Sequence, residues 1–152
     1  MTSQSSVTSE RNAQRGSKTR VPDTEDFNEF AEFRLALFEF QRRSEAVLET
    51  FDIGNRQFYA MLIIKNGSGR QLVTVGKVAR GMGIHPSSAS GLIARLEGAG
   101  LAERIFDLEN RRKVRVKLTA QGEQLLAEII TRDAEKADDL RQQCLELLQA
   151  TG

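Results

Sequence analysis

The order of local patterns in the middle of the chain constrains its fold more than any other feature. Thr74 can cap a short helix over 75–80, and a glycine-containing turn follows at 81–84. A second helix over 86–98 begins with a proline, which suits a first helical position. Gly100 can adopt the left-handed conformation that ends this helix. The sequence therefore predicts two short helices on either side of a tight turn.

Two strand-like segments follow these helices directly. Residues 101–106 and 113–118 are joined by the polar loop 107–112, and residues 71–73 could add a short strand. Apolar and basic residues alternate in the second segment, so that one of its faces is apolar and the other basic. A helix pair followed at once by a hairpin with a basic tip predicts a winged helix-turn-helix, in a chain that is mainly α with a small β-hairpin wing.

Long helical segments flank this unit. A helix is predicted from about residue 23 to 51, with Asp23 or Thr24 as its cap and Gly54 as the break after it. A shorter helix is predicted over 56–65, before a loop at 66–69. The first is apolar on two faces, one with Phe30, Phe33, Leu37 and Phe40, and the other with Phe27, Ala31, Leu35 and Phe38. A small monomer cannot cover both faces, so a partner chain is expected. Thr119 can cap a last helical region, in which the polar stretch 132–139 leaves open a bend or a break.

Charge is divided unevenly along the 152 residues although the net charge is only +1. Residues 53–118 contain twelve Lys and Arg against four Asp and Glu, whereas the acidic residues outnumber the basic ones in 23–52 and in 119–152. A basic middle between acidic ends is typical of a nucleic-acid-binding surface on a scaffold that does not bind.

Several classes of function find no support in the sequence. No nucleophile–base pair, glycine-rich phosphate loop or metal cluster is recognisable, so we expect neither an enzyme nor a bound metal or cofactor. No segment approaches 18 apolar residues, and no signal peptide is recognisable. The single cysteine, Cys144, fits a reducing compartment and lies on an apolar stripe, where we expect it to be buried and unreactive. We therefore expect a cytoplasmic protein.

The residue types on the second short helix and on the hairpin loop suit contact with duplex DNA. A helix that enters the major groove needs small polar or basic residues on its exposed face, and Ser87, Ser88, Ser90 and Arg95 meet this condition. Ala89, Leu92, Ile93 and Leu96 can face the core. Arg111 and Arg112 at the hairpin tip, with Lys113 beside them, can reach a flanking minor groove. His85 either contacts a phosphate or only ends the turn before Pro86.

These motifs together resemble the MarR family of bacterial transcription regulators. The resemblance covers about residues 71–126. It is carried by the order and spacing of Val73-Thr74-Val75, Pro86-Ser87-Ser88-Ala89-Ser90, Arg95-Leu96-Glu97, Gly100-Leu101, Arg104, Asp107-x-x-Asn110-Arg111-Arg112 and Val116-x-Leu118-Thr119-x-x-Gly122.

The resemblance implies a homodimer that binds a pseudo-palindromic DNA operator and acts as a repressor. Many family members release DNA when a small aromatic or phenolic effector binds, and Phe58 and Tyr59 lie near the place of that pocket, although plain core packing explains them too. We divide the chain accordingly into a disordered basic tail (1–22) and a single MarR-like domain (23–152). Within that domain, 23–53 and 119–152 would form dimerisation helices, and 54–118 the DNA-binding part.

Two departures from the family pattern leave other interpretations open. Gly91 stands where the family usually has a larger residue, and either the backbone approaches DNA closely there or a base contact is absent. Asn110 stands where aspartate is common, so a wing arginine would lack an ionic partner. These departures are what a winged-helix protein-interaction module without DNA binding would show, and non-specific architectural binding is a third alternative.

Overall fold

A computed structural model describes residues 21–67, 73–110 and 112–150, except for some side chains near the C-terminus. The chain divides into two compact units, residues 1–34 and 35–152. The long helix α2 (Thr24–Glu49) begins in the first unit, where the Asp23 carboxylate accepts hydrogen bonds from the backbone N–H groups of Glu25 and Asp26 at 2.9 and 3.0 Å. Asp23 is therefore its N-cap, as one of the two predicted alternatives.

Helix α2 ends two residues earlier than predicted. Asp52, and not Gly54, adopts the left-handed conformation, with φ of 55°. The backbone N–H of Ile53 then donates to the carbonyl of Leu48 at 3.2 Å, which closes the helix end. A short acidic side chain tolerates this conformation better than most residues do, so the glycine was not required for the turn.

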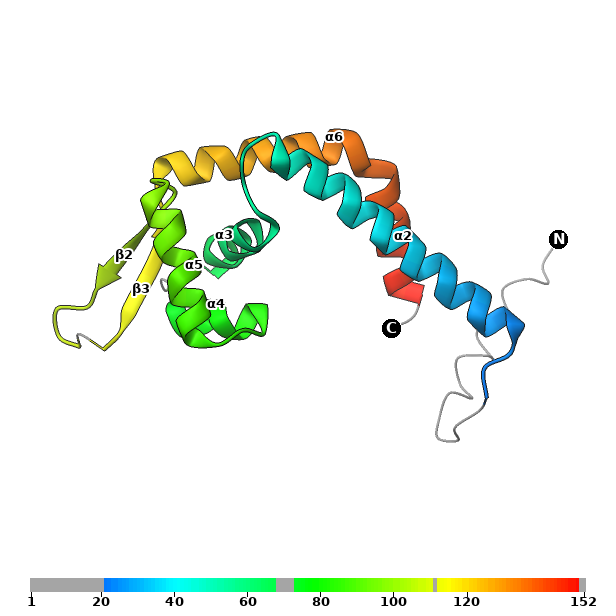
Figure 1. Cartoon of the computed structure of the whole chain (residues 1–152), viewed down its shortest axis with the longest axis horizontal. Coiled ribbons are helices and arrows are strands. Elements are labelled where there is room, and N and C mark those ends of the chain that lie inside the picture. The colour runs from blue at the N-terminus through cyan, green and yellow to red at the C-terminus, as the bar shows by residue number, and fades with distance from the viewer. Residues whose placement is uncertain (1–20, 68–72, 111, 151–152) are drawn as a thin grey trace. The chain divides into compact units, whose positions relative to one another are not determined.

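The remaining elements form a helical unit with a hairpin that extends at one side of it (Figure 1). In chain order they are α3 (Asn55–Gly67), β1 (Val73–Thr74), α4 (Val75–Met82), α5 (Pro86–Gly98), β2 (Ala102–Phe106), β3 (Val114–Leu118) and α6 (Ala120–Ala150). The predicted helices and hairpin are all present. The predicted loop at 66–69 was wrong for Asn66 and Gly67, which belong to α3, while Ser68 and Gly69 lie outside the described residues. Similarly, Gly81 and Met82 continue α4 and are not part of the turn.

The sheet is antiparallel with strand order β1-β3-β2. Val116 of β3 lies opposite Val73 of β1 on one side and opposite Arg104 of β2 on the other. Strand β3 is therefore the central strand. The short strand suggested at 71–73 is present at Val73–Thr74, and its first two residues lie outside the described part. The sheet thus consists of the two wing strands and one short strand that leads into α4.

The core lies between the end of α2, α3, α4, α5, the sheet and the first half of α6. Its largest fully buried side chains within 35–152 are Leu48, Met61, Ile64, Ile93, Leu96, Ile129, Val47, Val73, Val78 and Val116. The four α5 residues expected to face the core, Ala89, Leu92, Ile93 and Leu96, are all buried. The core therefore fixes which face of α5 remains exposed.

Helix α6 runs without interruption from Ala120 to Ala150, so the polar stretch 132–139 does not divide it. Its start is fixed by Thr119, whose hydroxyl accepts from the backbone N–H of Gly122 at 3.0 Å and donates to the carbonyl of Gly100 at 2.6 Å. Thr119 therefore caps α6, as predicted, and also ties it to the end of α5. The expectation for Cys144 concerns a side chain outside the described part.

Candidate nucleic-acid interface

The turn between α4 and α5 has the geometry of a helix-turn-helix. The Thr74 hydroxyl accepts from the N–H of Lys77 at 3.2 Å and caps α4, as predicted. At the other end Gly83 adopts a left-handed conformation (φ 62°), and the N–H of Ile84 donates to the carbonyl of Ala79 at 3.0 Å. This glycine lets the chain reverse within three residues and start α5 against α4.

His85 caps the N-terminus of α5. Its Nδ1 accepts from the backbone N–H of Ser87 at 3.3 Å and lies 2.8 Å from the Ser87 hydroxyl oxygen. Pro86 occupies the first turn, where no N–H is needed. His85 therefore does end the turn, and its exposed ring leaves the predicted alternative of a phosphate contact untested.

The exposed face of α5 carries short side chains and one arginine. Ser87, Ser88 and Arg95 are exposed, and so is Gly91, where an added Cβ would meet no atom within 4 Å. Arg95 makes no ion pair among the described residues. The nearby carboxylate of Glu97 pairs with Arg104 instead. Three of the four residues predicted to contact DNA on this helix are therefore available at one surface.

Ser90 has a different environment from the other predicted serines. It is half-buried, and its hydroxyl and carbonyl oxygens accept from the Arg104 guanidinium at 3.0 and 2.8 Å. Arg104 also pairs with the carboxylate of Glu97 at 2.5 Å, and its backbone N–H donates to the same carboxylate at 3.1 Å. Strand β2 is thereby attached to α5 at two positions about two helical turns apart.

Arg104 was predicted only as part of a motif, with no role of its own. A signal was present, because strand alternation puts Arg104 on the same face as the buried Ala102. A charged residue on the inner face of a strand needs a partner, and Glu97 lies seven residues before it in the sequence. What the pattern could not show was the additional contact to Ser90.

Hydrogen bonds within the loop organise the wing tip. The Asp107 carboxylate accepts from the N–H groups of Glu109 and Asn110 at 2.9 and 3.4 Å. The Asn110 amide oxygen accepts from the N–H of Arg112 at 3.2 Å, and its carbonyl accepts from Lys113 at 2.9 Å. Asn110 thus shapes the tip without the ion pair that an aspartate would make. Arg112 and Lys113 are exposed, and Arg111 lies outside the described residues.

The hydrogen bonds from Glu109 and Asn110 lower the pKa of Asp107 below its ordinary value, and the nearby Arg115 and Lys113 lower it further. The charged form therefore stabilises the wing above the ordinary pKa of about 4, and this contribution is lost as the pH falls through the lowered pKa. We expect the Glu109 and Asn110 amide signals to titrate below about pH 4 in an NMR pH series. In the Asp107→Asn variant these two amide signals should not shift below about pH 4. A midpoint at or above the ordinary value would contradict the assignment.

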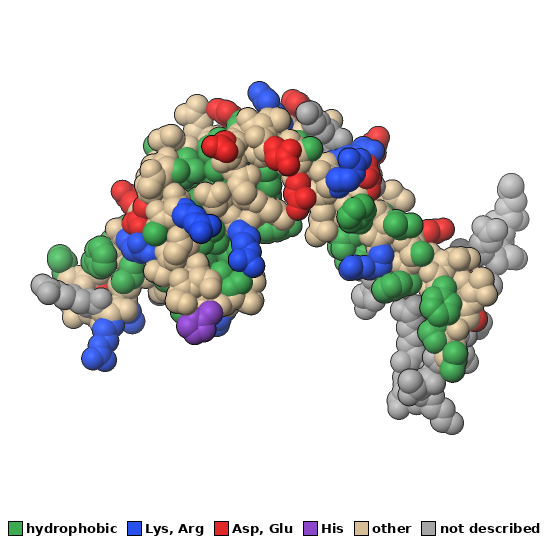
Figure 2. All heavy atoms as spheres, viewed as in Figure 1, with side chains coloured by type: hydrophobic (Ala, Val, Ile, Leu, Met, Phe, Trp, Pro, Cys, Tyr) green, Lys and Arg blue, Asp and Glu red, His purple; other side chains and the backbone are tan. Residues whose placement is uncertain are grey.

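Basic side chains gather over the hairpin and the α4–α5 part, and many of the acidic ones lie over α6 (Figure 2). On the hairpin, two basic residues are partly neutralised, since Lys117 pairs with Glu103 at 2.8 Å and Arg115 lies 3.8 Å from Asp107. Arg95 on α5 and Arg112 and Lys113 at the wing tip are exposed cations without such a pair among the described residues, and they are available to an anionic ligand.

The two residues predicted to line an effector pocket differ in exposure. Phe58 is buried in the core, whereas Tyr59 is exposed. The centroids of the Phe58 and Tyr59 rings are 5.8 Å apart. A shallow depression of about 420 Å³ on α6 includes neither of them and is lined by Gln124, Ala127, Glu128, Thr131, Arg132 and Glu135. The surroundings of Phe58 are those of a core residue, which was the other interpretation given to it.

Within the described residues no cluster of three His, Cys, Asp or Glu side chains could hold a metal ion. In the same part of the chain, no helix combines the length and the apolar character that crossing a membrane requires.

The fold and this site define a winged helix-turn-helix protein. Residues 51–113 match the model of the MarR family. A relative from Bacillus subtilis, an uncharacterised HTH-type transcriptional regulator named YsmB, is 34% identical over 68 residues. That match covers 45% of this chain and 47% of YsmB, so the chain spans about half the length of this curated relative.

Solved structures of MarR-type proteins share the fold. A MarR family protein from Bacillus stearothermophilus is 23% identical with a TM-score of 0.69, over 85% of this chain and 96% of that one. The S. aureus regulator MepR in complex with DNA is 25% identical with a TM-score of 0.62, over 74% of this chain and 82% of that one. The resemblance inferred from the motifs is confirmed, as is the mainly helical winged fold.

Proposed function

We propose that this protein is a sequence-specific transcription regulator, a repressor, that binds duplex DNA as a homodimer. The observation that carries the proposal is the exposed face of α5 beside a hydrogen-bonded cationic wing. The DNA complex of MepR, whose fold is similar, supports it. Helix α5 would enter the major groove and the wing the adjacent minor groove, with two half-sites about one helical turn, roughly 34–36 Å, apart.

The homodimer accounts for an apolar stripe that the single chain leaves exposed. Phe27 and Phe30 in the first unit are 62% and 65% exposed, and Leu35 and Phe38 in the second are 66% and 63% exposed. Large apolar side chains in this number along one helix are costly to leave in water. On the other predicted face of this helix, Leu37 and Phe40 are half-buried within the second unit, whereas Phe30 is exposed. A partner would therefore cover the exposed residues of both faces.

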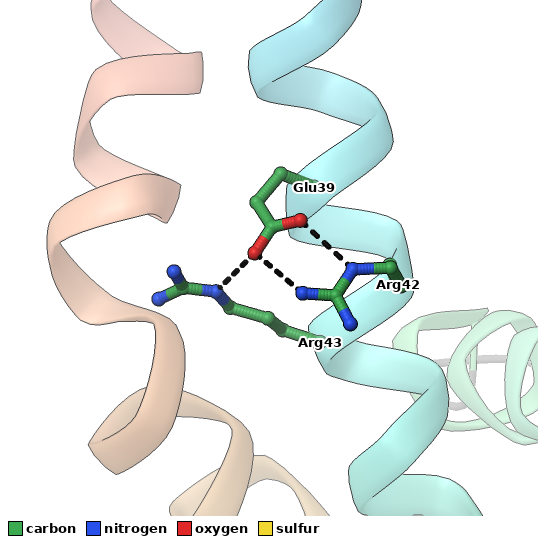
Figure 3. Close-up of polar contacts among 3 residues, drawn as sticks. All are labelled: Glu39, Arg42 and Arg43. Atoms are coloured by element: carbon green, nitrogen blue, oxygen red, sulfur yellow. Dashed lines mark hydrogen bonds and ion pairs between the residues drawn. The ribbon is translucent and has the colours of Figure 1, made fainter.

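A charged cluster on α2 marks where this stripe ends (Figure 3). Arg42, four residues after Phe38, donates two hydrogen bonds to Glu39 at 2.8 and 2.9 Å, and Arg43 donates to the same carboxylate at 2.8 Å. The bonds from Arg42 and then Arg43 lower the pKa of Glu39 to about 2. The cluster therefore stays charged at neutral pH, which limits an apolar interface to the residues before it.

Each part of the interface has a separate role in the proposal. Ser87 and Ser88 would contact base edges or phosphates in the major groove, and Arg95 would reach a base or the backbone. Arg111, Arg112 and Lys113 would supply the wing's charge. For Ser90 we propose a positioning role, because its hydroxyl already holds Arg104. Response to a small aromatic or phenolic effector is proposed from the family alone.

The two groups of DNA-binding residues should have different effects on affinity. Replacing Arg111 and Arg112 together by alanine should flatten the slope of log K against log salt concentration, by about 0.9 for each phosphate that is no longer neutralised. Ser88→Ala should leave the slope unchanged and relax base preference in a selection from random duplexes. An unchanged slope in the double variant would remove the wing from the mechanism.

Gly91→Ala distinguishes the two explanations for this glycine. The added methyl group meets open space, and a mid-helix glycine costs about 1 kcal/mol relative to alanine, so the free protein should be stabilised by about that amount. We expect DNA affinity to be retained, because a base contact is absent at this position. A large loss of affinity in a stabilised protein would show instead that the backbone approaches the DNA closely.

The alternative is a winged-helix module that binds another protein. Gly91 and Asn110 favour it, because they remove a groove-reading side chain and an ionic brace. Gel-shift titration at low salt against duplexes from the protein's own upstream region separates the two: the proposal predicts a retarded complex, and the alternative predicts none. Equal affinity for cognate and random duplexes would indicate architectural binding.

A further inference from the structure

Two large apolar side chains are exposed on the wing, where a cationic hairpin would be expected to be polar. Leu108 is 98% exposed and Phe106 is 62% exposed. Figure 2 shows hydrophobic and basic side chains together over this hairpin. Single exposed apolar residues are common, but an almost completely exposed leucine beside an exposed phenylalanine at one hairpin tip indicates a surface that binds a ligand.

The backbone holds both residues in place. The two hydrogen bonds accepted by Asp107 form a turn around Leu108, and this turn fixes the residue at the tip. Phe106 ends β2 opposite Val114 and, by strand alternation, shares a face with Arg104, which contacts α5. The apolar pair is therefore on a hydrogen-bonded hairpin that is anchored to α5.

The charges around the pair favour a polyanion. Arg112 and Lys113 are exposed beside it, and the Asp107 carboxylate is occupied by backbone N–H groups and lies 3.8 Å from Arg115. Glu109 is the acidic residue at the tip with an exposed side chain. An apolar protein partner would be matched better by a neutral rim, whereas apolar residues with flanking cations suit the sugar edges and phosphates of a DNA minor groove.

We propose that Leu108, supported by Phe106, is an apolar contact of the wing in the minor groove. The inference rests on the proposed function, and it adds a contact to the wing arginines. Leucine and phenylalanine inserted into a minor groove press on sugars and base edges and favour sequences that widen easily. The wing would then read the shape of the flanking DNA, and the arginines would supply attraction that is independent of sequence.

The experiment uses the full-length protein and a duplex selected by the wild type from a random library. Leu108→Gln should weaken binding about tenfold, because the complex no longer buries a leucine side chain. It should leave the salt slope unchanged, because the number of neutralised phosphates stays the same. Val21→Gln is the matched control, since Val21 is 84% exposed before the start of α2, outside the proposed dimerisation and DNA-binding parts, and its substitution should have no effect on binding.

A change to the DNA tests the groove directly. Diaminopurine in place of adenine outside the two half-sites adds an amino group in the minor groove only. The diaminopurine substitution should weaken DNA binding by the wild type and have little further effect on DNA binding by the Leu108→Gln variant. Equal affinity of the variant and the wild type, or the same diaminopurine effect on both, would overturn the inference and leave the proposed function intact. If the wild type selects no duplex, the proposed function itself fails.

Discussion

Gly122→Ala should lower the free energy of unfolding by about 3 kcal/mol, which is a large fraction of the roughly 5–15 kcal/mol that stabilises a typical domain. A Cβ at this position would collide with the carbonyl oxygen of Leu101 and would lie 2.9 Å from the carbonyl carbon. Both atoms belong to the backbone, so no side chain can move to make room.

The surrounding hydrogen bonds prevent relaxation as well. The Leu101 carbonyl accepts from the N–H of Thr119 at 3.1 Å, and the Thr119 hydroxyl donates to Gly100. Gly100 itself has φ of 73°, a conformation that few other residues adopt. Shifting α6 away from Leu101 would therefore break the connection that holds the end of α5, and would disturb the interface with it.

Urea unfolding of both variants measures the effect against a matched control. Gly91→Ala is the same substitution at a helical glycine with open space around it, so it should stabilise the protein while Gly122→Ala destabilises it. If Gly122→Ala lowers the free energy of unfolding by less than about 1 kcal/mol, α6 does not approach the Leu101 backbone as closely as described.

Arg104→Met is the second substitution with a large expected effect. It removes the ion pair to Glu97 and both bonds to Ser90, and leaves a carboxylate that is only 30% exposed without its partner. We expect stability to fall by about 2 kcal/mol, because charged hydrogen bonds at half-buried sites contribute about 1.5–3 kcal/mol. DNA affinity should fall further than stability explains, because the wing is no longer held against α5.

Two comparisons separate the positioning role of Arg104 from a general structural one. Lys117→Gln removes an exposed pair to Glu103, with side chains 45% and 51% exposed, and should cost under about 0.5 kcal/mol. Arg104→Met should also reduce the contribution of the wing to the salt slope, measured at a temperature where the variant is fully folded. A normal slope and normal base preference in that folded variant would contradict the positioning role.

Most of the fold could be predicted because its signals are local. Thr74, Gly83, Pro86 and Gly100 set helix ends through their own backbone preferences, and each occupies its expected place. The errors arose where another residue performed the expected task. Asp52 made the turn assigned to Gly54, and Gly67 stayed helical, where an added Cβ would collide with the Val73 side chain.

The site was predicted less completely because its geometry depends on contacts between distant residues. The helical periodicity of α5 predicted that Ser87, Ser88 and Arg95 would be exposed, and they are. The contact of Ser90 with Arg104 joins residues 14 positions apart, and nothing in the helix pattern indicates it. The apolar tip at Leu108 was missed because the loop was described by its polar residues.

Hydroxyl-radical footprinting of the selected duplex tests the central claim most directly. A dimer with α5 in the major groove and a wing beside it predicts two equal sets of protections about one helical turn, roughly 34–36 Å, apart, each with a flanking minor-groove protection. A single protected site, or a pattern that Arg112→Ala and Ser88→Ala leave unchanged, would contradict the account.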